Sequence, residues 1–245
     1  MLASAGGGPA RSGFAMAVGR SPLSVDSRPW YLGALGELRV AAQLTKLGPD
    51  WTVLYSVPVG GRGSDVDHVL LGPAGVFTIN TKFHEDARIW VASKRLLVNG
   101  QKTDYLCNSR YEAQRVSHRV TAAAGVQIDA HPTIVLVGPR SITIRERPTD
   151  VAVLRDTELV RWLNRLPTTL DNEARGRITA AVTRRESWDG GHGRAPEVDE
   201  AASADLRRKV TLAHRVRVAW ATATLLGILT IAGTFAINAY STLLG

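Results

Sequence analysis

Residues suited to metal and phosphate chemistry flank a tight turn in the stretch SDVDHVLLGPAGVFTINTK (64–82). Asp65 and Asp67 precede the turn, whereas Asn80 and Lys82 follow it. Magnesium accepts carboxylate and amide oxygens as ligands and keeps several of its waters. A metal ion can polarise a phosphodiester, while a lysine orients the attacking water or stabilises the charge of the transition state. These residue types therefore fit hydrolysis of a phosphodiester bond.

The spacing of these residues predicts a β-hairpin with a four-residue loop at 72–75. Side chains alternate along a strand and cross-strand partners share a face, so the polar residues are expected to crowd one end of a single face. His68 is expected on the opposite, apolar face as a satisfied core histidine, with its ring nitrogens hydrogen-bonded. An exposed polar face with an ordinary Asp–Lys pair gives the same pattern, and that alternative stays open. The predicted pairs are Leu71–Val76, Val69–Thr78, Asp67–Asn80 and Asp65–Lys82.

Helical and strand patterns alternate around this hairpin. Residues 28–48 place apolar side chains on one helical stripe that ends at Gly48-Pro49. Residues 108–125 read as a second helix, with Asn108 as its cap and a glycine at its end. The order helix, three strands, helix, strand predicts an α/β domain. The remaining predicted elements are strands at 51–59, 132–138 and 150–156, a hairpin at 88–101, and helices at 156–166 and within 171–188. The apolar stripe of the helix predicted at 28–48 consists of Leu35, Leu38, Ala41, Leu44 and Leu47.

The composition favours a basic protein in a reducing compartment. The 245 residues carry a formal net charge of +8, and Cys107 is the only cysteine. A single cysteine excludes an internal disulfide framework. The basic balance favours nucleic acid or an anionic membrane surface as a partner, without choosing between them.

The C-terminal region predicts a membrane anchor. Residues 218–240 are almost entirely apolar and carry no side-chain charge, and about 20 helical residues suffice to cross a bilayer. A buried helix of a soluble domain is the alternative. Basic residues precede the segment, so the positive-inside rule predicts a single-pass protein of the cell membrane with its N-terminal domain in the cytoplasm. Small residues such as Gly227 and Gly233 could let two spans associate, and the oligomeric state is left open. The basic residues are Arg207, Arg208, Lys209, Arg215 and Arg217.

Three segments resemble the nuclease-related domain (NERD) family: GELRVAAQL, then SDVDHVLLGPAGVFTINTK, then NSRYEAQ. The resemblance runs from about Trp30 to about Gly138. It implies a restriction-endonuclease-like core with Mg²⁺ or Mn²⁺ as cofactor. Transferred position by position, it implies catalytic roles for Asp67, Lys82 and Glu37, and it matches Gln114 to a polar position of the following helix.

One position departs from the family pattern, because Asn80 stands where that pattern has the Glu of Glu-x-Lys. An amide oxygen can still ligate magnesium but contributes no charge, so weaker metal binding is expected. Asp65 or Glu37 would compensate if either reached the metal, and the expected ligands are therefore Asp67, Asn80 and Asp65. Three functions stay open: a membrane-anchored, metal-dependent nuclease, a catalytically silent module that binds nucleic acid or protein, or a membrane-surface scaffold in which the face around Asp67 has no ligand.

Basic residues outside the hairpin are candidates for nucleic-acid contacts. Arg62 lies in the loop before the hairpin, and Arg110, Gln114 and Arg115 lie on the second helix. An ordinary solvated helix face explains the helical residues equally well. The whole chain is then expected to contain a disordered leader (1–28), the nuclease-related domain (29–166), a helical extension (167–188), a polar linker (189–208), a basic juxtamembrane segment (209–217) and a transmembrane helix (218–240).

Overall fold

The computed structural model describes residues 27–60, 64–184, 187–188 and 200–244. The chain divides into two compact units, one of residues Trp30–Glu197 and one that includes the C-terminal helix. The first unit is built around a five-stranded sheet with the order β1-β2-β3-β7-β9. Its strands are β1 (Thr52–Gly60), β2 (Ser64–Gly72), β3 (Gly75–Phe83), β7 (Ala130–Val137) and β9 (Ala152–Arg155).

The sheet has the predicted topology. The first three strands form an antiparallel meander, and β7 then pairs in parallel with β3 after the chain has crossed over through a helix. β9 extends the sheet in parallel beyond β7. The central β3 is buried along most of its length, as expected for a strand that is covered on both faces. The predicted α/β order of helix, meander, helix and strand is therefore confirmed.

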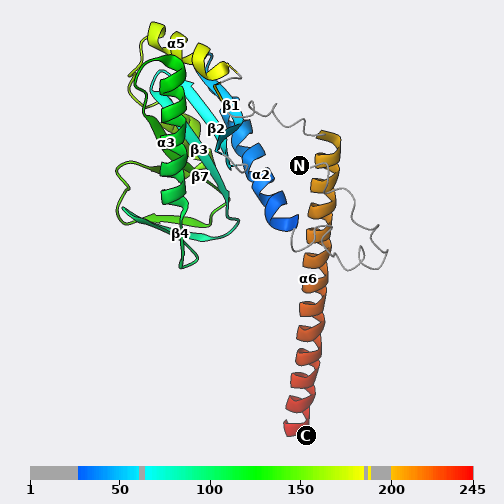
Figure 1. The fold of residues 1–245 in the computed structure, drawn as a ribbon. Coiled ribbons are helices and arrows are strands. Elements are labelled where there is room, and N and C mark those ends of the chain that lie inside the picture. The colour runs from blue at the N-terminus through cyan, green and yellow to red at the C-terminus, as the bar shows by residue number, and fades with distance from the viewer. Residues whose placement is uncertain (1–26, 61–63, 185–186, 189–199, 245) are drawn as a thin grey trace. The chain divides into compact units, whose positions relative to one another are not determined.

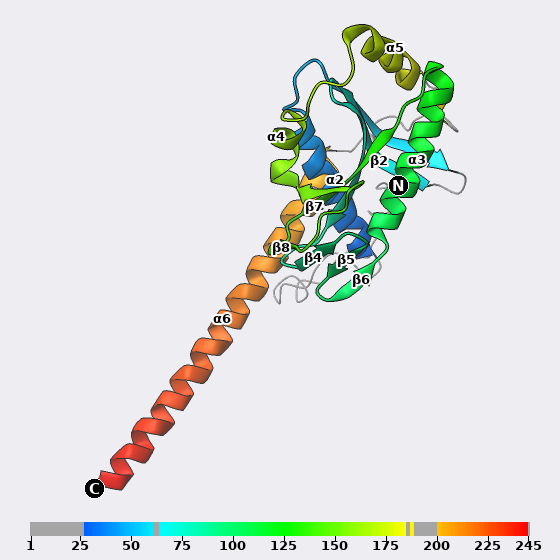
Figure 2. The same ribbon diagram turned by 90° about the vertical axis from the view of Figure 1, so that its left-hand side faces the viewer.

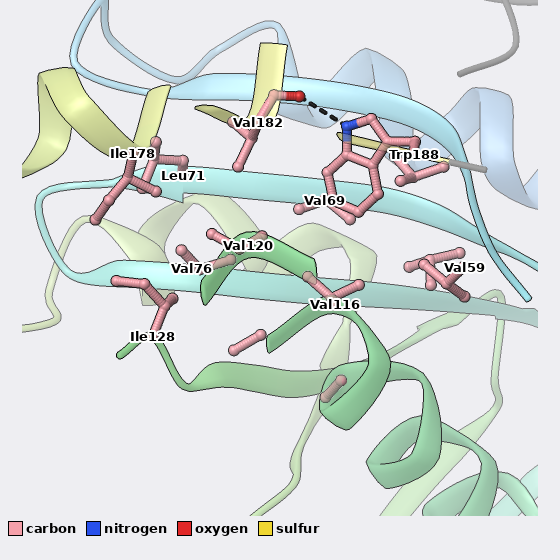
Figure 3. Packing of buried hydrophobic residues seen from close by; sticks show 14 residues of the cluster. Val59, Val69, Leu71, Val76, Val116, Val120, Ile128, Ile178, Val182 and Trp188 are labelled. Atoms are coloured by element: carbon pink, nitrogen blue, oxygen red, sulfur yellow. Dashed lines mark hydrogen bonds between the residues drawn. The ribbon is translucent and has the colours of Figure 1, made fainter. Parts of the chain in front are cut away.

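Helices cover both faces of this sheet (Figure 1). On one face, α3 (Tyr105–Ala124) and α5 (Asn172–Thr183) pack on Val69, Leu71 and Val76. Figure 3 shows this cluster, in which the Trp188 indole donates a hydrogen bond of 2.8 Å to the Val182 carbonyl. On the other face, α2 (Ser27–Leu44) and α4 (Leu159–Leu163) pack on alternate residues of the same strands, including Leu70, Phe77 and Ile79.

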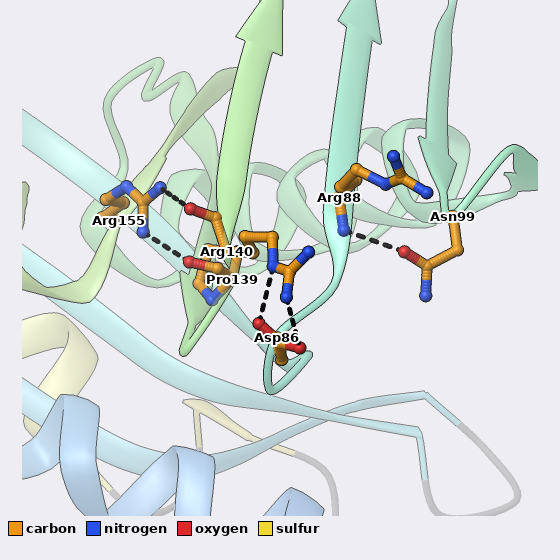
Figure 4. A network of polar contacts seen from close by, with 6 residues as sticks. All are labelled: Asp86, Arg88, Asn99, Pro139, Arg140 and Arg155. Carbon is orange, nitrogen blue, oxygen red and sulfur yellow. Dashed lines mark hydrogen bonds and ion pairs between the residues drawn. The ribbon is translucent and has the colours of Figure 1, made fainter. Parts of the chain in front are cut away.

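A smaller sheet is inserted after β3 and after β7 (Figure 2). Its order is β6-β5-β4-β8, from β4 (Arg88–Ala92), β5 (Arg95–Val98), β6 (Gln101–Thr103) and β8 (Ser141–Ile144). The hairpin predicted at 88–101 is β4 with β5, whereas β6 and β8 were not predicted. Polar contacts fasten the loops that join the two sheets: Arg140 pairs with Asp86 at 2.9 Å, and Arg155 donates to the Pro139 carbonyl (Figure 4).

Two helical details differ from the sequence-based expectation. α3 begins at Tyr105, and Asn108 is not its cap but an interior residue whose N–H bonds to the Asp104 carbonyl. The buried residues of α2 are Gly36, Val40 and Leu44, so within this helix Leu44 is the member of the predicted stripe that is buried. A glycine carries no hydrophobic weight in a sequence pattern, yet a Cβ at Gly36 would lie only 3.2 Å from the Phe83 Cβ. The helix therefore meets the end of β3 at its smallest residue.

The second unit contains one long helix, α6 (Glu200–Leu244). Within it, Arg215–Thr234 is long and apolar enough to cross a membrane, and apolar side chains such as Leu225 and Leu229 are more than half exposed. The last part of the predicted polar linker, 200–208, is helical and continuous with this segment, because a polar sequence without Pro or Gly can extend a helix. Residues 189–199 lie outside the described part of the chain.

Candidate active site

The β2–β3 ladder follows the predicted register near the turn and then stops. Leu71 pairs with Val76 and Val69 with Thr78, but the ladder ends at the pair His68–Ile79. The predicted ladder pairs Asp67–Asn80 and Asp65–Lys82 are therefore wrong. The Asp67 carboxylate accepts the Thr81 N–H instead. The Asp67 side chain thus satisfies the backbone N–H of Thr81 at the point where regular pairing with β2 ends.

Four charged residues nevertheless meet at this end of the strands. Glu37, on α2, lies close enough to Asp67, Lys82 and Asp65 for their charges to act on it. Burial raises the pKa of Glu37 to about 7; the negative Asp67 and Asp65 add to the rise, and Lys82 opposes it. Burial also raises the pKa of Asp67, against the opposing effects of the Thr81 N–H bond and of Lys82. Asp65 is exposed and lies at the rim of this group.

Glu112, on α3, belongs to the same group and was not predicted. The Asn80 side-chain amide donates a hydrogen bond of 2.6 Å from Nδ2 to Glu112 Oε2. Burial raises the pKa of Glu112, the Asn80 bond lowers it, and Asp67 raises it further. Helix periodicity could have placed Glu112 on the side of α3 that faces the sheet, because Glu112 lies one turn before the buried Val116. Gln114, the residue expected from the family resemblance, is exposed on another side of the helix.

Lys82 lies against an aromatic side chain at the start of α3. Its Nζ is 5.1 Å from the centre of the Tyr105 ring, and the Tyr105 hydroxyl is 3.1 Å from His84 Nε2. A cation over an aromatic face is held by the charge distribution of the ring. Tyr105 and His84 thus restrict where the lysine can point.

The residues at this site can supply oxygen ligands to a metal ion, but they do not form a ready-made cluster of acids. Within the described ranges, no three His, Cys, Asp or Glu side chains are grouped so as to hold a metal ion. Asn80 is only 6% exposed, and its Oδ1 is buried without a hydrogen-bond partner. An orphaned buried acceptor costs free energy unless a donor or a cation meets it. Asp67 and Asn80 therefore fit a divalent cation in donor type, with fewer acids than a dedicated cage supplies.

The basic candidates on α3 lie on different sides of that helix. Arg110 forms a two-pronged ion pair with Asp150, at 2.6 and 2.9 Å, so its charge is neutralised within the protein. Arg115 lies over the Tyr111 ring and faces a groove of about 930 Å³ that runs along α3. Arg115 and Arg119 follow Glu112 by about one and two helical turns. Arg62 lies outside the described residues. The groove is lined by Tyr111, Gln114, Arg115, His118, Arg119 and Arg184.

His68 lies on the α2 side of the sheet, as predicted. It is 2% exposed, with its ring edge towards Tyr55 at 5.3 Å, and burial lowers its pKa to about 4. Its Nδ1 has no hydrogen-bond partner, so the core histidine is buried but not satisfied as expected.

The fold and the site together define an α/β domain with an acid–lysine constellation at the end of two central strands. Residues 32–137 match the model of the NERD family, the nuclease-related domain, and this part of the chain is a nuclease-related domain as its resemblance predicted. No curated protein matches the chain.

Proposed function

We propose that the nuclease-related domain hydrolyses phosphodiester bonds in DNA or RNA with Mg²⁺ or Mn²⁺ as cofactor. The observation that carries this proposal is the convergence of Asp67, Glu37 and Lys82, whose charges act on one another beside the unpaired Asn80 oxygen. Perturbed acids beside a lysine are typical of catalytic sites, although ion-pair networks perturb pKa values too.

Each residue has a role that its position supports. Asp67 and the Asn80 oxygen would hold the cation, with Glu37 and the exposed Asp65 adding negative charge around them. A bound divalent cation supplies charge that polarises the phosphate and lowers the pKa of an attacking water. Lys82, restricted by Tyr105, would orient that water or stabilise the phosphate oxygens as negative charge develops on them.

The groove along α3 supports nucleic acid as the substrate. Arg115, Arg119 and Arg184 place positive side chains along this groove. Cations spaced along a groove attract a phosphate backbone regardless of its sequence. Arg110 contributes less to such binding because Asp150 already neutralises it.

The test measures Mn²⁺ binding and cleavage by the full chain in detergent. Wild type is expected to bind Mn²⁺ in calorimetry and to cut single- or double-stranded DNA or RNA, and Asp67→Asn to lose both. Asn keeps an acceptor for the Thr81 N–H, so the fold is preserved. Cleavage that survives Asp67→Asn or a strong chelator would overturn the proposal.

A catalytically silent binding module is the second candidate. The specific observation in its favour is that the described residues hold no three-acid metal cluster, with Asn80 in place of the expected glutamate. This function requires salt-sensitive nucleic-acid binding by wild type without metal-dependent cleavage.

The C-terminal helix supports membrane anchoring of this domain. Its segment Arg215–Thr234 has the length and composition of a membrane span. Lys and Arg residues on the N-terminal side of the segment favour a cytoplasmic location for the domain in the cell membrane.

A further inference from the structure

Two side chains from different elements meet in the site. Asn80 is on β3 and Glu112 is on α3, 32 residues later, and the Asn80 Nδ2 lies 2.6 Å from Glu112 Oε2. The residue expected at position 80 would have carried the acid on the strand. Here the strand carries an amide, and the nearest acid lies behind it on the helix.

The chemistry of the partner fixes which way the amide points. An ionised carboxylate can only accept hydrogen bonds, whereas an asparagine offers an NH₂ donor at one end and a carbonyl acceptor at the other. Glu112 therefore selects the NH₂ end of Asn80. The carbonyl oxygen must then face away from the helix, and it is this Oδ1 that is buried without a partner.

We infer that Glu112 is a positioning residue that holds the Asn80 amide with its oxygen towards the cation. The inference rests on the proposed metal-dependent function. A strand amide and a helix carboxylate together then replace the single strand glutamate of the family pattern. The amide oxygen supplies the ligand, and Glu112 supplies its orientation, as partners behind a ligand commonly do in metal sites.

The first arm of the test uses Mn²⁺ titration calorimetry of the full chain in detergent. Glu112→Ala frees the amide to turn and is expected to weaken Mn²⁺ binding about 10- to 100-fold. Asn80→Asp places two carboxylates at hydrogen-bond distance and is expected to weaken binding as well. The double variant Asn80→Asp/Glu112→Gln exchanges charge and amide without changing the shape of either side chain. It is expected to bind Mn²⁺ at least as tightly as wild type.

The second arm needs no metal. In ¹⁵N NMR spectra recorded with a chelator, the Asn80 side-chain amide is identified by its loss in Asn80→Asp. A clamped amide gives two well-separated proton signals that exchange slowly with water, and Glu112→Ala is expected to bring them to the positions of a free amide.

The outcomes separate the inference from the proposed function. An Asn80 amide that looks free in wild type, or an unchanged Mn²⁺ affinity in Glu112→Ala, overturns the inference. Failure of the double variant to recover the affinity lost in Asn80→Asp overturns it too. A clamped amide in a wild-type protein that binds no Mn²⁺ overturns the proposed function and leaves Glu112 as the residue that orients Asn80.

Discussion

Lys82 is the residue whose replacement tests the chemistry most directly. Lys82→Ala removes a cation that acts on both Glu37 and Asp67, and is expected to lower the rate of cleavage by at least about 10²-fold. The domain should keep its thermal stability, because the lysine is only partly buried. Lys94→Ala, in the turn between β4 and β5, is the matched control and should cut normally. Undiminished cleavage by Lys82→Ala would remove the lysine from the site.

His68 makes the stability of the domain depend on pH. Its pKa is about 4 in the folded protein against 6.5 in an unfolded chain, so the unfolded state binds more protons between these values. This contribution to the free energy of unfolding is fully present above pH 6.5 and is lost as the pH falls towards 4. The slope is about 1.4 kcal/mol per pH unit, or roughly 3 kcal/mol in all.

Denaturant unfolding at several pH values, followed by near-UV circular dichroism, measures this effect as a difference between proteins. His68→Leu should lose the His68 slope, whereas the exposed His118→Gln should behave as wild type. The comparison between wild type and His68→Leu is needed because Glu37 changes the stability with pH in the opposite direction: its raised pKa favours the folded state as the pH falls through 7. Identical pH profiles for wild type and His68→Leu would contradict the burial of a neutral imidazole.

At the scale of elements, two of the basic side chains on α3, Arg110 and Arg115, are expected to have different roles. Arg115→Ala should weaken nucleic-acid binding and reduce the slope of log affinity against log salt by about 1, because one phosphate contact is lost. Arg110→Ala should change that slope little, since its partner Asp150 already neutralises the guanidinium. Fluorescence anisotropy titrations at salt concentrations between about 50 and 200 mM measure both slopes.

Arg95→Ala, on the smaller sheet, controls for the simple loss of one positive charge. Equal slopes for Arg115→Ala and Arg95→Ala would show that binding follows net charge rather than the groove along α3.

The order of elements could be read from the sequence, but the contacts between them could not. Alternating apolar residues placed β2 and β3, and the turn fixed their register as far as Val69 and Thr78. Where this pairing ends, the Thr81 N–H donates to the Asp67 carboxylate, a side-chain contact that strand periodicity does not encode. Likewise, Glu112 reaches Asn80 only because the crossover returns α3 to the sheet, and that contact spans 32 residues. Local patterns carry no information about such distant pairs.

At the scale of the whole molecule, Cys107 provides a test of membrane topology. It is the only cysteine of the chain and is exposed on α3. If the domain is cytoplasmic, a membrane-impermeant maleimide should leave intact cells unlabelled and should react with Cys107 after permeabilisation. Cys107→Ser controls for labelling elsewhere. Labelling of intact cells would place the domain outside.

The contact between α2 and β3 has a consequence for the substitutions that this chain can tolerate. Gly33 and Gly36 lie one turn apart on α2, but a Cβ at Gly33 meets nothing within 4 Å, whereas one at Gly36 meets Phe83 and Thr81 at 3.2 and 3.3 Å. Alanine at position 33 should stabilise the helix by roughly 1 kcal/mol and leave the activity unchanged. Alanine at position 36 would push the helix, and Glu37 with it, away from Asp67. A saturation library selected for activity should therefore accept many residues at position 33 and retain glycine at position 36.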